Sequence, residues 1–248
     1  MKLVIDPHCH TVASGHAYST VTEYADEARR CGLSLVAMTD HAPAMPCSIG
    51  EFYFHNFTAV PDEINGVRIM MGVELNILDK SGRVDLDDRP LDSIAPVIAS
   101  FHPPCYRYAR EGMNESEKRD EITDAMVSVM DNNYVQILGH PGDPRFPFDI
   151  DRIVRKSMET GVLLEINNAS LAETGIRSGS REIIAEILHT CKRLNCPVVV
   201  GSDAHFSTAA GKFDSTLLLL NDHDFPERLV ANTSLELFYS LLRNKEVW

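Results

Sequence analysis

Residues 2–10 read KLVIDPHCH, a short apolar run that ends in two histidines. Side chains two positions apart in an extended segment point to the same side, so His8 and His10 can bind one ion while Cys9 points away. An H-x-H pair alone is weak evidence for a metal site. It gains weight here because the same pattern, an apolar run followed by a candidate ligand, returns along the chain.

Six strand-like runs lead into residues that can bind metal. The runs are 2–6, 33–39, 68–73, 97–101, 134–139 and 198–202, and a seventh run at 162–167 carries no histidine. The nine candidate ligands are His8, His10, His16, His41, Glu74, His102, His140, Asp203 and His205. Helical patterns lie between most runs, which is typical of parallel α/β folds. Because the active site of a (β/α) barrel lies at the carboxyl ends of its strands, the spacing predicts a barrel of about seven strands with the site at that face.

Length and composition fit one domain over residues 1–248. The chain has 248 residues, of which 44% are hydrophobic, and barrels of this type run to about 250 residues. The first run begins at residue 2, which leaves no room for a signal peptide, and no apolar run approaches the roughly 20 residues that span a bilayer. The six cysteines form no C-x-x-C pair, which suits a reducing compartment. We expect a soluble, cytoplasmic protein without a membrane partner, and the sequence leaves its oligomeric state open.

The formal net charge of −13 argues against a nucleic acid as partner, because the chain lacks the positive charge that a phosphate backbone requires. A small anionic substrate remains compatible with this charge. Three divalent ions would add about +6 against the −2 of Glu74 and Asp203, which leaves the pocket at about +4.

Each candidate ligand also has an ordinary interpretation. Glu74 could form an ion pair with a lysine or arginine, although metal binding would equally remove the cost of burying its charge. His16 or His41 alone would suit a loop or a helix cap. The recurrence at equivalent positions, rather than any single residue, favours the metal site.

Helix signals are clear between the runs. Residues 20–23 (TVTE) form a capping-box pattern for a helix that ends at Cys31 before Gly32. Further helices are expected over 115–130, 150–160, 180–194 and 234–243.

The successive motifs resemble those of the PHP (polymerase and histidinol phosphatase) superfamily. They are His8-x-His10, His16, Thr39-Asp40-His41, Gly72-Val73-Glu74, Phe101-His102, Gly139-His140-Pro141 and Gly201-Ser202-Asp203-Ala204-His205. The stretches TVASGHAYST (11–20) and LEINNAS (164–170) are similar, more narrowly, to YcdX-type phosphatases. This resemblance implies a distorted (β/α)7 TIM-like barrel with three divalent metal ions, most often zinc, with manganese or iron as alternatives.

The resemblance also implies ligand sets and a reaction. One ion would be held by His8, His10, Glu74 and Asp203, a second by Glu74, His102 and His140, and a third by His16, His41 and His205. Glu74 would bridge the first two ions, and Glu74, Asp203 and His205 are predicted to be catalytic. The implied activity is hydrolysis of small phosphate monoesters by a metal-bridging hydroxide. Arg177, Arg107 and Lys212 are candidates for further contacts to the phosphate.

Three other functions remain open at this stage. A histidinol-phosphate phosphatase would use the same metals and differ in its substrate loops. An amidohydrolase-type C–N hydrolase also begins with H-x-H, but many of these enzymes use a lysine as bridging ligand, whereas Glu74 has that role here. A non-enzymatic metal-binding protein is the third, and the open coordination positions of the implied second and third ions argue against it.

Overall fold

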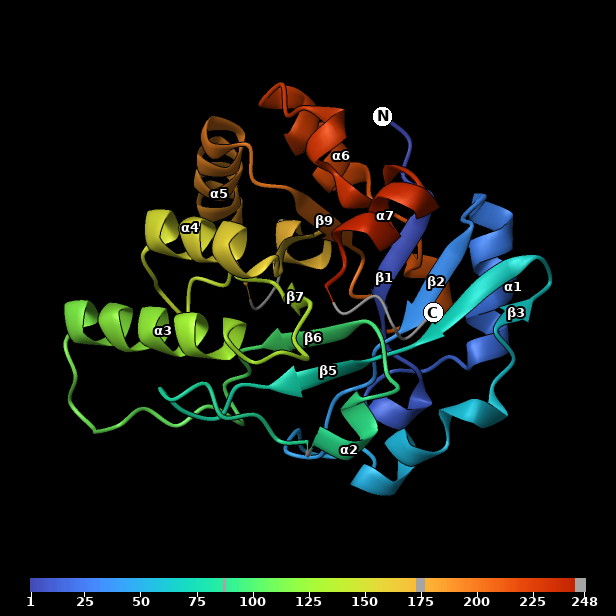
Figure 1. Cartoon of the computed structure of the whole chain (residues 1–248), viewed down its shortest axis with the longest axis horizontal. Helices are drawn as coiled ribbons and strands as arrows, with labels where there is room; N and C mark the ends of the chain where they lie inside the picture. The colour runs from blue at the N-terminus through green and yellow to red at the C-terminus, as the bar shows by residue number, and fades with distance from the viewer. Residues whose placement is uncertain (87, 173–176, 244–248) are drawn as a thin grey trace.

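Parallel strands and outer helices alternate along the chain (Figure 1). The computed structural model describes residues 1–86, 88–172 and 177–243. The strands are β1 (Ile5–Cys9), β2 (Leu35–Met38), β3 (Glu63–Ile64), β4 (Val67–Met71), β5 (Val73–Asn76), β6 (Val97–Ser100), β7 (Ile137–Leu138), β8 (Leu163–Asn167) and β9 (Val198–Gly201). They form two sheets, in the orders β1-β2-β4-β3 and β5-β6-β7-β8-β9. All paired strands are parallel except β3 and β4.

The two sheets adjoin at Gly72, where β4 continues into β5. The predicted run 68–73 is therefore divided: β4 pairs with β2, and β5 pairs with β6. A Cβ at Gly72 would lie 2.3 Å from the carbonyl oxygen of Pro96, so only glycine allows this close approach. The α/β, TIM-like fold is confirmed, while the described strands form two sheets rather than one closed ladder.

The other junction, between β1 and β9, is joined by the side chain of Asn232. Its Nδ2 donates to the carbonyl oxygens of Ile5 (3.0 Å) and Val200 (2.8 Å), and its Oδ1 accepts from the Val200 amide (3.1 Å). Asn232 is fully buried. This amide thus supplies hydrogen bonds that a continuous ladder would make, next to the strands that carry the first and last candidate ligands.

The inner face of the strands is apolar at one end and polar at the other. A buried cluster of Ile5, Leu35, Met70, Ile98, Ile137, Leu163 and Val199 is covered by Phe238 and Leu242. Along β6, Ile98 belongs to this cluster, and residues 100 and 102, two and four positions further on, are buried Ser100 and His102. Since alternate residues of a strand face the same side, the polar end collects the candidate ligands.

Seven α-helices occur in the described residues. They are α1 (Val21–Cys31), α2 (Asp88–Leu91), α3 (Glu115–Met130), α4 (Ile150–Thr160), α5 (Ser180–Leu194), α6 (Asp214–Asp222) and α7 (Leu235–Leu241). The predicted capping box forms between Thr20 and Glu23, and the helices expected over 115–130, 150–160 and 180–194 are confirmed. The terminal helix is shorter than the expected 234–243. None of the helices in the described part of the chain is long and apolar enough to cross a membrane.

The strands differ from the prediction in two further respects. The first strand is Ile5–Cys9 rather than 2–6, because pairing with β2 begins at Ile5 and Met1 and Lys2 are exposed. The hairpin of β3 and β4 was not predicted, although Asn65 and Gly66 at its turn, with φ of 54° and 82°, are the residues that such two-residue turns favour.

We predict that Asn232→Leu lowers the free energy of unfolding by about 3 kcal/mol, because it leaves the backbone groups of Ile5 and Val200 without partners in the interior. Urea denaturation in the presence of a chelator measures this loss without a contribution from bound metal. Asn221→Leu, at an exposed position of α6, should change stability by no more than about 0.5 kcal/mol. Equal midpoints for the two variants would show that the β1–β9 junction does not need the amide.

Candidate metal centre

The structure brings all nine predicted ligands together at the carboxyl ends of the strands. Nε2 of His8 lies 3.1 Å from Nε2 of His10, and Nε2 of His140 lies 2.9 Å from Oε1 of Glu74. Nε2 of His16 lies 3.1 Å from Nε2 of His205. Ligand atoms from strands far apart in the sequence therefore face a common centre.

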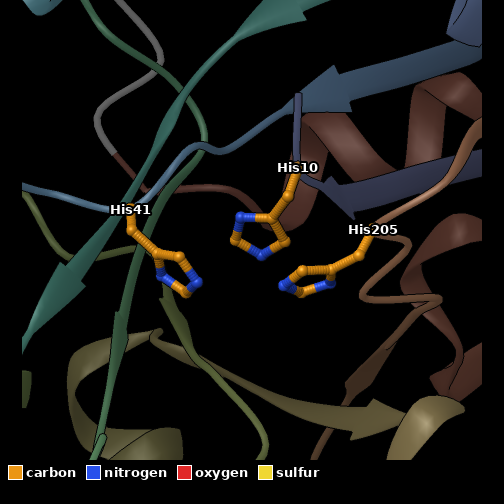
Figure 2. A group of neighbouring side chains, drawn as sticks. All are labelled: His10, His41 and His205. Carbon is orange, nitrogen blue, oxygen red and sulfur yellow. The ribbon is translucent and has the colours of Figure 1, made fainter. Parts of the chain in front are cut away.

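Three groups of these residues could each hold an ion. They are His10, His41 and His205; His8, His10 and Asp203; and His41, Glu74 and His102, and the ligand atoms of each group lie within 4.8 Å of one another. Figure 2 shows the first group, in which three rings from different parts of the chain converge. The ring centroid of His10 lies 4.3 Å from that of His41 and 4.4 Å from that of His205.

His41 lies closer to Glu74 than the implied ligand sets suggest. Its Nδ1 is 2.7 Å from Oε2 of Glu74, whereas the family resemblance gave His41 to the third ion alone. His10 and His41 each belong to two of the three groups. Because neighbouring groups share residues, the geometry allows the ligands to be divided among the ions in more than one way. The assignment of ligands to individual ions therefore remains a prediction.

Five of the seven histidines have an oxygen atom within hydrogen-bond distance of Nδ1. The pairs are His8 with Glu165 Oε1 (2.7 Å), His10 with Ser14 Oγ (3.1 Å), His16 with the Ser14 carbonyl (3.1 Å), His102 with Asn76 Oδ1 (2.8 Å) and His205 with the Asp203 carbonyl (3.0 Å). A carboxylate, carbonyl or amide oxygen accepts, so Nδ1 carries the proton in a neutral ring. The lone pair of each ring is then on Nε2, the nitrogen that a metal would bind.

Sequence reasoning missed the three side chains that make these contacts, those of Glu165, Ser14 and Asn76. The Ser14 hydroxyl donates to Oδ1 of Asp40 (2.7 Å), so its oxygen accepts from His10. Asn76 donates through Nδ2 to the Ala42 carbonyl (3.2 Å), which orients its Oδ1 towards His102. Partners of this kind fix the orientation of metal-binding histidines.

Glu165 on β8 holds two parts of the centre. Oε1 lies 2.7 Å from Nδ1 of His8, and Oε2 accepts from the backbone amide of His140 (2.7 Å). A Cβ at position 201 would lie 1.9 Å from Oε1 of Glu165, so Gly201 makes room for this carboxylate. The run 162–167 carries no histidine and was assigned no role, but a carboxylate within an apolar strand was the available signal.

The two carboxylates among the predicted ligands are ionised. Burial would raise the pKa of Glu74, but the neighbouring imidazoles, that of His102 foremost, hold it well below its ordinary value. The pKa of Asp203 is likewise low, since His8 and Arg177 outweigh the effect of burial. Burial, together with His41 and His205, lowers the pKa of His10 and keeps its ring neutral. Ionised carboxylates and neutral imidazoles are the forms that bind metal.

The donor set fits divalent metal ions such as zinc. Imidazole nitrogen and carboxylate oxygen are ordinary zinc ligands. Nδ1 of His41 and Oε2 of Glu74 are buried and lie 2.7 Å apart without forming a hydrogen bond to each other or to another group, a costly state that a bound cation would relieve.

A cavity of about 560 Å³ opens beside this centre. Its lining includes His16, His41, His102, Asp203 and His205 together with Arg177, which sequence reasoning named, and Arg145, which it missed. The lining does not include the other two predicted phosphate contacts, Arg107 and Lys212. The guanidinium of Arg107 donates to the Tyr106 carbonyl.

Comparison with known proteins establishes the family. Residues 6–240 match the family model described as PHP domain. The chain belongs to the PHP domain family. Probable phosphatases of Caldanaerobacter subterraneus subsp. tengcongensis and Acetivibrio thermocellus are 43% and 42% identical to this PHP protein, and the alignments cover 99% of it and 93% and 98% of the relatives. The family resemblance is thus confirmed, and the predicted activity agrees with the names of these relatives.

Two solved structures share the fold of this PHP protein. A histidinol phosphate phosphatase from Lactococcus lactis, complexed with zinc, L-histidinol and phosphate, aligns with a TM-score of 0.63 at 18% identity and covers 91% of this chain and 95% of its own. A putative histidinol phosphatase from Listeria monocytogenes aligns with a TM-score of 0.59 at 16% identity, over 86% and 99% of the two chains. At these identities the likeness concerns the fold alone.

We predict that Glu165→Gln weakens zinc binding about 10- to 100-fold, because the uncharged amide is a weaker acceptor for the Nδ1–H of His8 and makes that ligand less basic. Competition with a chromophoric chelator measures the change. Glu159→Gln is the matched control, since this glutamate is exposed on α4. If both variants keep the zinc affinity of the wild type, Glu165 does not support a metal ligand.

Proposed function

We propose that this PHP protein is a metal-dependent phosphatase that hydrolyses small phosphate monoesters at a centre of three divalent ions, with zinc the favoured metal and manganese or iron as alternatives. The observation that carries the proposal is the set of five histidines whose Nδ1 contacts direct Nε2 inwards, beside two ionised carboxylates and an open cavity. All nine residues are proposed ligands, with Glu74, Asp203 and His205 in catalytic roles.

Bound divalent ions supply Lewis acidity and lower the pKa of water towards about 7. The chain itself supplies binding and orientation. Arg177 donates through Nη1 to Oδ2 of Asp203 (2.8 Å), and its Nε is buried without a hydrogen-bond partner. Its side chain lines the cavity, so the guanidinium is placed to bind a phosphoryl oxygen, which is the acceptor that arginine prefers. Hydrolysis breaks the P–O bond of the ester, joins the oxygen of water to phosphorus, and delivers a proton to the departing alcohol.

The comparisons support this proposal. The relatives that match 99% of the chain are named probable phosphatases. The Lactococcus lactis enzyme of the same fold holds zinc and phosphate, which agrees with a metal-dependent reaction on a small phosphorylated compound. The net charge of −13 disfavours long polyanions such as DNA.

The test of the reaction class is hydrolysis of p-nitrophenyl phosphate. Activity should disappear with a chelator and return with zinc or manganese, because the buried carboxylates and imidazoles bind phosphate only through the ions. A loaded protein that cleaves no phosphate monoester but hydrolyses an amide or single-stranded DNA would refute the phosphatase and leave the metal centre intact.

A second prediction concerns stoichiometry. Gently purified protein should contain more than two divalent ions per chain, because nine ligands exceed what two four-coordinate sites with one shared carboxylate would use. Elemental analysis of the metal-loaded protein measures the number. One ion or none would exclude the trinuclear centre.

A third prediction compares Glu74 with His16. Glu74→Ala should remove about two ions and reduce kcat/KM at least about tenfold more than His16→Ala, because Glu74 contacts several ligands whereas His16 lies at the edge of the centre. Metal content and kcat/KM are measured on the same preparations. Wild-type metal content and activity in Glu74→Ala would contradict the bridging role.

A further inference from the structure

Two arginines share one buried carboxylate beside the candidate metal centre. Nε of Arg145 donates to both oxygens of Asp143, at 2.9 and 3.1 Å, and Nε of Arg177 lies 3.6 Å from Oδ2 of the same residue. Asp143 is 2% exposed, whereas the side chains of Arg145 and Arg177 are 35% and 14% exposed and line the cavity. The two guanidiniums thus line the cavity, whereas the Asp143 carboxylate between them is buried beneath the cavity wall.

The two guanidiniums differ in their contacts with the metal centre. Arg177 contacts Asp203, a proposed metal ligand, whereas Arg145 is connected to Arg177 through Asp143. Arg177 can therefore reach a phosphate held at the metals. Arg145 is placed to contact a more distant part of the same substrate, the alcohol that hydrolysis releases.

Within residues 1–86, 88–172 and 177–243, the rest of the lining is mostly uncharged. It includes Met45, Pro103, Pro104, Ala169 and Ala172. Among the described residues of the lining, the sole acid is Asp203, which is a proposed metal ligand and already forms an ion pair with Arg177. Asp143 and Asp203 balance the two arginines, so this part of the wall is about neutral before any metal is counted, and bound divalent ions would make it positive.

We propose that the substrate carries a second anionic group, a carboxylate or another phosphate, on its leaving alcohol, and that Arg145 recognises it. The inference rests on the proposed phosphatase function and adds its substrate class. Arginine suits this role, because its planar guanidinium binds carboxylate and phosphate through paired hydrogen bonds. If the leaving alcohol carries an amine, as histidinol does, that amine would lie next to a positively charged arginine, whereas an amine needs a carboxylate as its partner. The site therefore selects against histidinol phosphate.

Two matched pairs of small substrates test this preference. 3-Phosphoglycerate has a carboxylate where glycerol 3-phosphate has a hydroxymethyl group. Phosphoglycolate has a carboxylate where phosphoethanolamine has an aminomethyl group. Each compound is assayed as a substrate of the metal-loaded enzyme and as a competitor of p-nitrophenyl phosphate hydrolysis. The carboxylated member of each pair should have a kcat/KM, or an inhibition constant, about tenfold more favourable.

Arg145→Gln tests whether this residue sets the preference. The ratio within each pair should fall about five- to tenfold towards unity, while metal content stays unchanged and kcat/KM for p-nitrophenyl phosphate, which has no second anion, changes by less than about threefold. Comparing ratios cancels the different intrinsic reactivities of the esters. Arg155→Gln, at an exposed arginine of α4, should leave both ratios as in the wild type.

The outcomes separate the two proposals. If the enzyme hydrolyses p-nitrophenyl phosphate but shows no preference for the carboxylated compounds, the proposed substrate class is wrong and the phosphatase function stands. The same conclusion follows if Arg145→Gln keeps the preference of the wild type. A higher kcat/KM for histidinol phosphate than for 3-phosphoglycerate also overturns it. Absence of any metal-dependent phosphatase activity overturns both.

Discussion

The hydrogen bond from the outer nitrogen of five of the seven imidazoles is the interaction on which this centre depends. Seven histidines packed together would otherwise be free to rotate and to exchange protons among themselves. A contact from Nδ1 to an oxygen decides where the proton lies and which nitrogen faces inwards. These oxygens come from Glu165, Ser14, Asn76 and two backbone carbonyls, so the chemistry of the centre is set by residues around it as well as by the ligands.

The fold places those supporting residues by the same rule that places the ligands. On β8, Leu163 belongs to the inner apolar cluster, and Glu165 and Asn167 follow at intervals of two. Each strand therefore contributes apolar contacts at one end and polar groups at the other. The irregularities lie where the ladder is interrupted: Gly72 precedes Glu74 by two residues, and Asn232 joins the strands that lead to His8 and Asp203.

The sequence was sufficient to predict the alternation of parallel strands and helices, three helices to the residue, and the nine residues that gather at one end. Parallel strands that each end in a candidate ligand leave few other arrangements. Glu165, Asn76 and Arg145 could not be predicted in this way, because their roles depend on neighbours far away in the sequence. Glu165 meets His8 only after β8 and β1 approach each other, and Arg145 is brought near Arg177, far along the chain, by their shared contact with Asp143. The break at Gly72 likewise depends on contact with Pro96.

The β1–β9 junction has a consequence for how the protein is made in the cell. The ribosome delivers His8 and His10 first, and Asp203, His205 and Asn232 only near the end of synthesis. A growing chain that has not yet reached β9 lacks one side of the centre, and its first two histidines are without Asp203, one of the acidic partners they contact in the finished protein. Capture of a full complement of ions is therefore a late event that follows release of nearly the whole polypeptide, when the metal supply of the surrounding compartment decides which ions enter.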